Sequence, residues 1–162
     1  MSINKITACL LGSMLCFTTL TVFAGTKILA NYGELLQALD SGNAVRAIAH
    51  LDKCKLDSGG GLVGLSGGIN FDVFNHYIMP IDSLHTKEVI ATSKTVFSIT
   101  PIQSLGFVLN YIRLHVFKDN TAQLFGAIID PKTYEQKITV SYTCTVSNDA
   151  TQAGIMLYST EA

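Results

Sequence analysis

The sequence predicts an all-β domain, an antiparallel barrel or sandwich of seven to nine strands with one short N-terminal helix. Three observations lead to this prediction. Apolar runs between residues 107 and 146 are separated by turn residues, the last of these runs alternates between apolar and polar side chains, and two cysteines lie next to strand-like segments. Alternation indicates a strand with one buried and one exposed face, because successive strand side chains point to opposite faces.

The runs FVLNYIRLHVF and AQLFGAIID flank Asp119-Asn120, a pair that tolerates the left-handed backbone of a tight hairpin turn. A two-residue turn at this pair would place Val116 opposite Gln123. A third strand follows the Asp130-Pro131 turn, and its alternation predicts one buried face made of Ile138, Val140, Tyr142, Cys144 and Val146.

The N-terminal part of the chain predicts one helix and a first strand. Leucines recur at helical spacing in NYGELLQALDSG, where Asn31 can cap the start of a helix and Gly42 can end it. We expect this short amphipathic helix to cover one face of a sheet or an opening. The segment 44–51 then alternates and predicts a strand that leads to Cys54.

Further strands are predicted by alternation in the middle and at the end of the chain. The segment 69–79 reads as one strand whose odd positions are mostly apolar and buried, and Pro80 ends it. The segment 89–99 is expected to split around Ser93-Lys94 into two short strands, and residues 155–158 to add a last one.

The first 24 residues have the pattern of a cleaved secretory signal peptide. Lys5 precedes an uncharged, largely apolar run that ends in Val22-Phe23-Ala24, a suitable cut site. A membrane-spanning helix would need about 20 strongly apolar residues, and the threonines here argue against one. We therefore expect a single domain over residues 25–162, exported into a periplasm or secreted, with no stable membrane insertion.

Two of the four cysteines, Cys9 and Cys16, lie in the predicted leader, so Cys54 and Cys144 remain. In an exported chain such a pair most plausibly forms a disulfide. The chain-entropy model assigns a bond that closes so long a loop about 4–5 kcal/mol. The alternatives are two free buried thiols or a metal pair, and two sulfur ligands rarely complete a zinc site.

Charge and motifs exclude several functional classes. With 11 basic and 12 acidic residues and no basic cluster, the chain lacks the electrostatic footprint of a nucleic-acid-binding protein. Gly59, Gly61 and Gly64 match a dinucleotide-binding spacing, but a strand pattern follows where that motif requires a helix. We expect no cofactor.

Catalytic patterns do not rise above background. The histidines at positions 50, 76, 85 and 115 lack the spacing of a metal site, so we predict no metal. Asp82, Ser83 and His85 are too close in sequence for a catalytic triad, whose members come from separate elements. We therefore expect a protein that is not an enzyme.

Several segments resemble the VirK proteins, small exported, virulence-associated proteins of Gram-negative bacteria. They are YGELLQAL, the DKC that contains Cys54, GGINFDVF, DSLHT, YIRLHVFKDN, DPKTYE and YTC, and they cover roughly residues 32–146. The resemblance implies the leader and one domain, and it brings no catalytic residue with it. Candidate binding positions are the polar residues within strand-like segments: Ser83, His85, Tyr111, Arg113 and His115.

The leading hypothesis is a non-catalytic, disulfide-stabilised binding protein for a small apolar ligand or an unknown protein partner. One alternative is a metal-assisted or acid–base hydrolase that uses His85, His115 and carboxylates in one cleft. The other is a protein–protein interaction module that uses a sheet edge.

Overall fold

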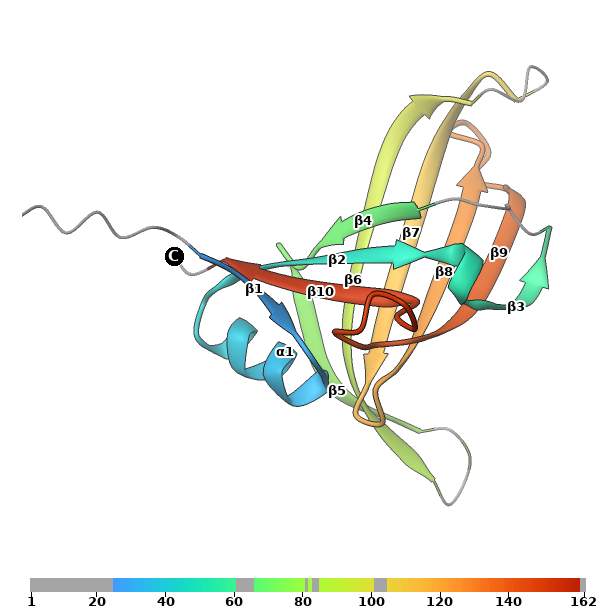
Figure 1. Cartoon of the computed structure of the whole chain (residues 1–162). Helices are drawn as coiled ribbons and strands as arrows, with labels where there is room; N and C mark the ends of the chain where they lie inside the picture. The colour runs from blue at the N-terminus through green and yellow to red at the C-terminus, as the bar shows by residue number, and fades with distance from the viewer. Residues whose placement is uncertain (1–24, 61–65, 81, 83–84, 101–104, 161–162) are drawn as a thin grey trace, which may run out of the picture.

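The computed structural model describes residues 25–60, 66–80, 82, 85–100 and 105–160. Within these ranges the chain forms ten strands, one α-helix and one short 3-10 helix (Figure 1). The predicted leader, residues 1–24, lies outside the described residues.

The smaller sheet has four antiparallel strands in the order β1-β10-β2-β4. Their bounds are Thr26–Leu29 for β1, Ala44–His50 for β2, Ser66–Asn70 for β4 and Ile155–Thr160 for β10. The predicted first and last strands are thus confirmed as β2 and β10, which pair with each other. The sequence pattern did not predict β1, a short edge strand whose first three residues are exposed.

The larger sheet has six antiparallel strands in the order β3-β9-β8-β7-β6-β5. The bounds are Lys55–Gly59 for β3, Phe74–Pro80 for β5, Thr86–Ile99 for β6, Phe107–Phe117 for β7, Thr121–Ile129 for β8 and Gln136–Thr145 for β9. The predicted meander is β7-β8-β9. β3 was not predicted, because its five residues are all exposed and do not alternate.

The smaller sheet runs across one face of the larger one, and the two remain separate sheets (Figure 1). One core lies between them, because Ala47, Ile69 and Leu157 from the smaller sheet belong to the same buried cluster as Ile90 and Leu114 from the larger. The predicted all-β fold is confirmed, and of the two predicted architectures the sandwich is the one observed.

The predicted helix is α1, Tyr32–Asp40, and its caps are those expected. The Asn31 side chain accepts a hydrogen bond from the Glu34 backbone N–H, and Gly42 follows the helix with a positive φ of 77°. One helix face is buried in the core shared by the sheets, through Tyr32, Leu35, Ala38 and Leu39.

The prediction of one strand over residues 69–79 was wrong. β4 and β5 lie in different sheets, and the chain turns between Phe71 and Val73. The Thr92 hydroxyl fastens this corner by donating to the carbonyls of Asn70 and Val73, at 3.2 and 2.8 Å. The sequence alternates straight through the corner, so Val73 was expected in the core but is 74% exposed.

The split predicted in segment 89–99 was also wrong, since β6 is one strand of 14 residues. Residues 89–92 are buried, whereas Ser93-Lys94 and the residues up to Phe97 are exposed. The polar pair therefore marks the point where the strand leaves the core and not a break in the strand.

The β7–β8 hairpin has its left-handed residue at Asn120, with a φ of 62°, as predicted. Its loop, however, has three residues, 118–120, and Val116 pairs with Ala122 in place of Gln123. A three-residue loop that ends in a left-handed residue is a common hairpin form, and it shifts the register by one position.

The predicted buried face of β9 is confirmed only near its end. Tyr142, Cys144 and Val146 are buried, but Ile138 is 37% exposed and Val140 is half-buried. In Figure 1 the larger sheet extends past the smaller one, so the start of β9 has no strand above it.

The predicted disulfide is present between Cys54 and Cys144, which are 90 residues apart in sequence with Cα atoms 4.5 Å apart. Cys54 directly follows the 3-10 helix η1, Leu51–Lys53, which connects β2 to β3. The bond thus ties the crossing between the sheets to β9 and excludes the alternatives of free thiols or a metal pair.

We predict that Cys54→Ser lowers the free energy of unfolding by about 4 kcal/mol, because the unfolded chain loses a long closed loop. Urea unfolding followed by circular dichroism measures this. The double variant Cys54→Ser/Cys144→Ser should resemble the single one. Wild-type protein whose urea midpoint is unchanged by dithiothreitol would contradict the prediction.

Candidate functional site

The sandwich contains an apolar cavity of about 180 Å³ between its two sheets. The smaller sheet contributes Ala47 and Ala49 from β2 and Gly67 from β4, and the larger sheet contributes Leu114 and Leu124. Nearly all of its wall is hydrocarbon. Sites for small molecules are typically concave and mostly apolar, which makes this cavity the first candidate for a binding site.

The cavity exists because the smaller sheet places small residues above it. Ala47 pairs with Ile69 and Ala49 pairs with Gly67, so methyl groups and a bare backbone face the larger sheet. A Cβ added at Gly67 would meet nothing within 4 Å, and Gly67 is not among the positive-φ glycines. The space is therefore left open by the choice of residue and not by a backbone constraint.

The cavity continues into an uncovered part of the larger sheet. β4 is an edge strand, and Figure 1 shows β6, β7 and β8 extending beyond it. The same face of the sheet there carries Val96, Ile112 and Ile138, which are 44%, 37% and 37% exposed, together with Lys94. We call these four residues the open trough. Ile112 belongs both to it and to the cavity wall.

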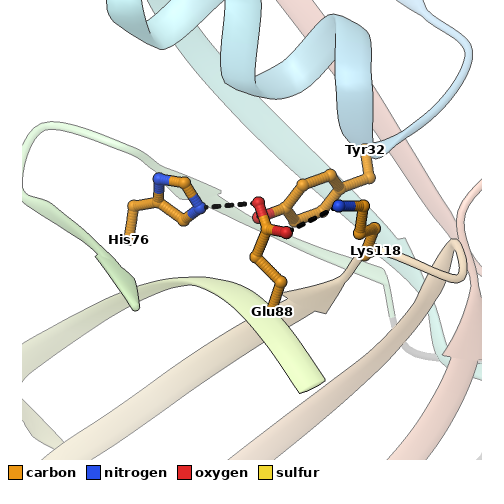
Figure 2. A network of polar contacts seen from close by, with 4 residues as sticks. All are labelled: Tyr32, His76, Glu88 and Lys118. Carbon is orange, nitrogen blue, oxygen red and sulfur yellow. Dashed lines mark hydrogen bonds and ion pairs between the residues drawn. The ribbon is translucent and has the colours of Figure 1, made fainter. Parts of the chain in front are cut away.

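A polar network connects α1 to the larger sheet at another place (Figure 2). The Glu88 carboxylate accepts hydrogen bonds from Lys118 Nζ at 2.8 Å and from the Tyr32 hydroxyl at 3.3 Å, and it lies 3.0 Å from His76 Nε2. Tyr32 begins α1, and its backbone N–H donates to Asn120 Oδ1 at 2.8 Å. The start of the helix is thereby fixed to β6 and to the loop between β7 and β8.

The charges in this network neutralise one another. The hydrogen bond from Lys118, followed by that of His76, lowers the pKa of Glu88 below its usual value. Burial, with the neighbouring Glu88 carboxylate, raises the pKa of Tyr32 to about 12. Glu88 is thus held ionised and Tyr32 protonated, each by its partners. A carboxylate whose oxygens already have three partners stabilises a helix contact, which is the role we assign to it.

Two of the predicted binding residues precede β6. Ser83 lies outside the described residues. His85 is exposed, and its Nδ1 lies 2.8 Å from Asp82 Oδ2. His85 lies six residues before Ala91, and Ala91 is paired with His115 across β6 and β7. At strand spacing that is a separation of about 20 Å. The structure therefore does not bring His85 and His115 into one cleft, as the hydrolase alternative requires.

The other three predicted residues lie on the outer face of β7, away from the cavity. Tyr111 and Arg113 both contact the Phe125 ring, with centroids 6.2 Å apart for Tyr111 and the guanidinium carbon 5.2 Å from the ring centre for Arg113. His115 is 7% exposed between Tyr77 and Phe117, and its Nδ1 has no partner. Burial, then Arg113, lowers the pKa of His115. The structure brings these three together but not with His85.

No group of three or more His, Cys, Asp or Glu side chains among the described residues lies in a position to hold a metal ion. No helix formed by these residues is both long enough and apolar enough to span a bilayer.

Sequence reasoning missed both the cavity and the network. Gly67 lies in β4, two residues before the segment 69–79 for which alternation predicts a strand. The network joins residues 32, 76, 88 and 118, which only the sheet pairing brings together. Alternation in GGIN could have placed Gly67 on the same strand face as Ile69, which is buried two residues later.

Comparison with known proteins gives one family and one fold. The family model described as VirK protein matches residues 28–134. A crystal structure of a VirK family protein from Legionella pneumophila aligns with a TM-score of 0.61 and 14% sequence identity, covering 80% of this chain and 97% of that one. At this identity the structural likeness concerns the fold alone. No curated protein matches the chain.

We predict that Glu88→Gln lowers the thermal midpoint at pH 7 and that the loss disappears in acid. The folded-state pKa of Glu88 lies below the ordinary value of 4.5, so its stabilisation is complete above that value and is lost as the pH falls through the folded pKa. Differential scanning calorimetry between pH 3 and pH 7 measures the difference between variant and wild type.

The matched control is Glu135→Gln, which removes an exposed carboxylate paired with Lys137. Such surface pairs contribute little, so we expect a nearly unchanged midpoint. Equal effects of the two substitutions at pH 7 would contradict the assigned role of Glu88.

Proposed function

This chain belongs to the VirK family, and we propose that it is an exported, non-catalytic accessory protein that binds a small apolar ligand between its two sheets. Membership of the family suggests a virulence-associated protein. The observation that carries the proposal is the hydrocarbon-lined cavity that opens at the edge of the sandwich, beside β4.

The size and lining of the cavity define the ligand class. An engineered cavity of about 150 Å³ lined by aliphatic and aromatic groups binds benzene, so the space here suits about one ring or a short hydrocarbon segment. A ligand that fills the cavity buries apolar surface, and this burial contributes about 25 cal/mol per Å² to the free energy of binding. The lining offers few hydrogen-bonding groups to a polar solute. A larger ligand would extend along the open trough.

Export is supported by the disulfide and by the leader pattern. The Cys54–Cys144 bond is consistent with an oxidising compartment, since such bonds persist outside the cytosol. A periplasmic or secreted location follows if residues 1–24 are removed as the sequence predicts. The non-catalytic role is supported by the separation of His85 from His115 and by the full set of partners around Glu88.

We predict that benzene binds in the cavity and that Gly67→Val abolishes the binding. The valine side chain would enter the empty space above Gly67 without a backbone penalty. Titration of ¹⁵N-labelled protein with benzene should shift the amide signals of Ala47, Gly67 and Leu124. Mass spectrometry of an organic extract of the purified protein would then search for a retained natural ligand.

Gly60→Val is the matched control, because both glycines are exposed and a Cβ at either meets nothing within 4 Å, but Gly60 lies outside the cavity wall. This variant should bind benzene as the wild type does. Cavity filling in Gly67→Val should also raise the free energy of unfolding by about 1 kcal/mol. Unshifted cavity signals in wild-type protein saturated with benzene would refute the proposal.

A further inference from the structure

The open trough is an apolar surface with one positive charge. Three of its four residues are aliphatic and exposed, and the fourth is Lys94. Within the described strands of the larger sheet, Lys94 is the one lysine or arginine on the face that carries the core. The other described basic residues of these strands, such as Lys87 and Arg113, alternate to the opposite face.

Lys94 lies next to the mouth of the cavity. It pairs directly with Ile112 across β6 and β7, and Ile112 lines the cavity. Side chains opposite each other in an antiparallel pair have Cβ atoms about 5 Å apart, and a lysine side chain is long enough to bring its ammonium group over the opening.

The ammonium group is available to a ligand. Lys94 forms no ion pair with a described residue, although three other lysines in the larger sheet and its loops do. Glu88 is an acidic residue on the same face of β6, and its carboxylate already has Lys118 and His76 as partners. Within the described part of the chain, the charge of Lys94 therefore has no acidic partner.

The floor between cavity and trough is aliphatic. Ile112 pairs with Gly126, and Gly126 pairs with Val140, whose Cγ1 lies 3.1 Å from where a Cβ of Gly126 would stand. A hydrocarbon chain can lie along this surface with one end in the cavity. Its other end then lies near the ammonium group.

We propose that the ligand is a medium-chain carboxylate whose hydrocarbon tail enters the cavity and whose carboxylate pairs with Lys94. This inference rests on the proposed function and specifies its ligand. An amine of the same length places a second cation beside Lys94, and a neutral alcohol leaves the lysine without a counter-charge. The site should therefore order three ligands of equal chain length by charge, with the anion binding most tightly.

The test compares octanoate, 1-octanol and octylamine by isothermal titration calorimetry on the purified protein. We expect octanoate to bind about threefold more tightly than octanol, because an ion pair with an exposed lysine adds a modest stabilisation. Lys94→Gln should remove this preference and leave octanol binding unchanged. The preference should also shrink as salt is raised from 50 mM to about 500 mM, since Lys94 is exposed.

Lys55→Gln is the control, because Lys55 pairs with Thr143 and lies on the opposite face of the same sheet. This substitution should leave the binding of octanoate as in the wild type. Gly67→Val should abolish the binding of octanoate and octanol alike, because both tails need the cavity.

Equal affinities for octanoate and octanol, or an unchanged octanoate affinity in Lys94→Gln, would overturn the carboxylate inference while the apolar site stands. Loss of neither ligand in Gly67→Val would overturn the apolar site as well. If no eight-carbon probe binds but a peptide of alternating valine and threonine shifts the amide signals of β4, the trough binds a protein strand and the inference is wrong.

Discussion

The relative position of the two sheets depends on the Cys54–Cys144 disulfide. The chain leaves the smaller sheet after β2 and enters the larger one at β3, and the bond ties this crossing to the end of β9, shortly before the chain returns to the smaller sheet as β10. Gly154, just before β10, packs so closely that an added Cβ would lie 2.8 Å from the Cys54 sulfur. This corner holds both sheets by a covalent link, and the polar network at Tyr32 holds the helix independently.

Because the disulfide and the polar network at Tyr32 stabilise the sandwich, part of its interior can remain unfilled. Leu114 and Leu157 in the core are fully buried, yet the cavity beside Gly67 stays open. Voids in a protein core are destabilising because their lining atoms lose contacts. A void at the edge of the fold, beside the trough, is the arrangement that the proposed binding site requires.

Sequence reasoning identified the fold class, the helix with its caps and the disulfide, because each leaves a local or compositional signal. It failed where position in the sheet decides the outcome. Val73 alternates with Ile69 and Phe71 but lies past a corner, and Ser93-Lys94 looked like a break although β6 continues. The candidate site was missed for the same reason, since the role of Gly67 depends on what the opposite sheet leaves vacant.

The long strands β6 and β7 are enclosed at one end and bare at the other. Residues 89–92 and 114–117 are buried, and Val89 is shielded from solvent on the outer face as well, beside Phe117. Toward Phe97 and Phe107 the same hairpin is exposed on its sides. Backbone amides should accordingly exchange with deuterium slowly near Val116 and faster near Phe97 and Phe107. The trough is therefore bordered by the end of these two strands that has the least support from the rest of the molecule.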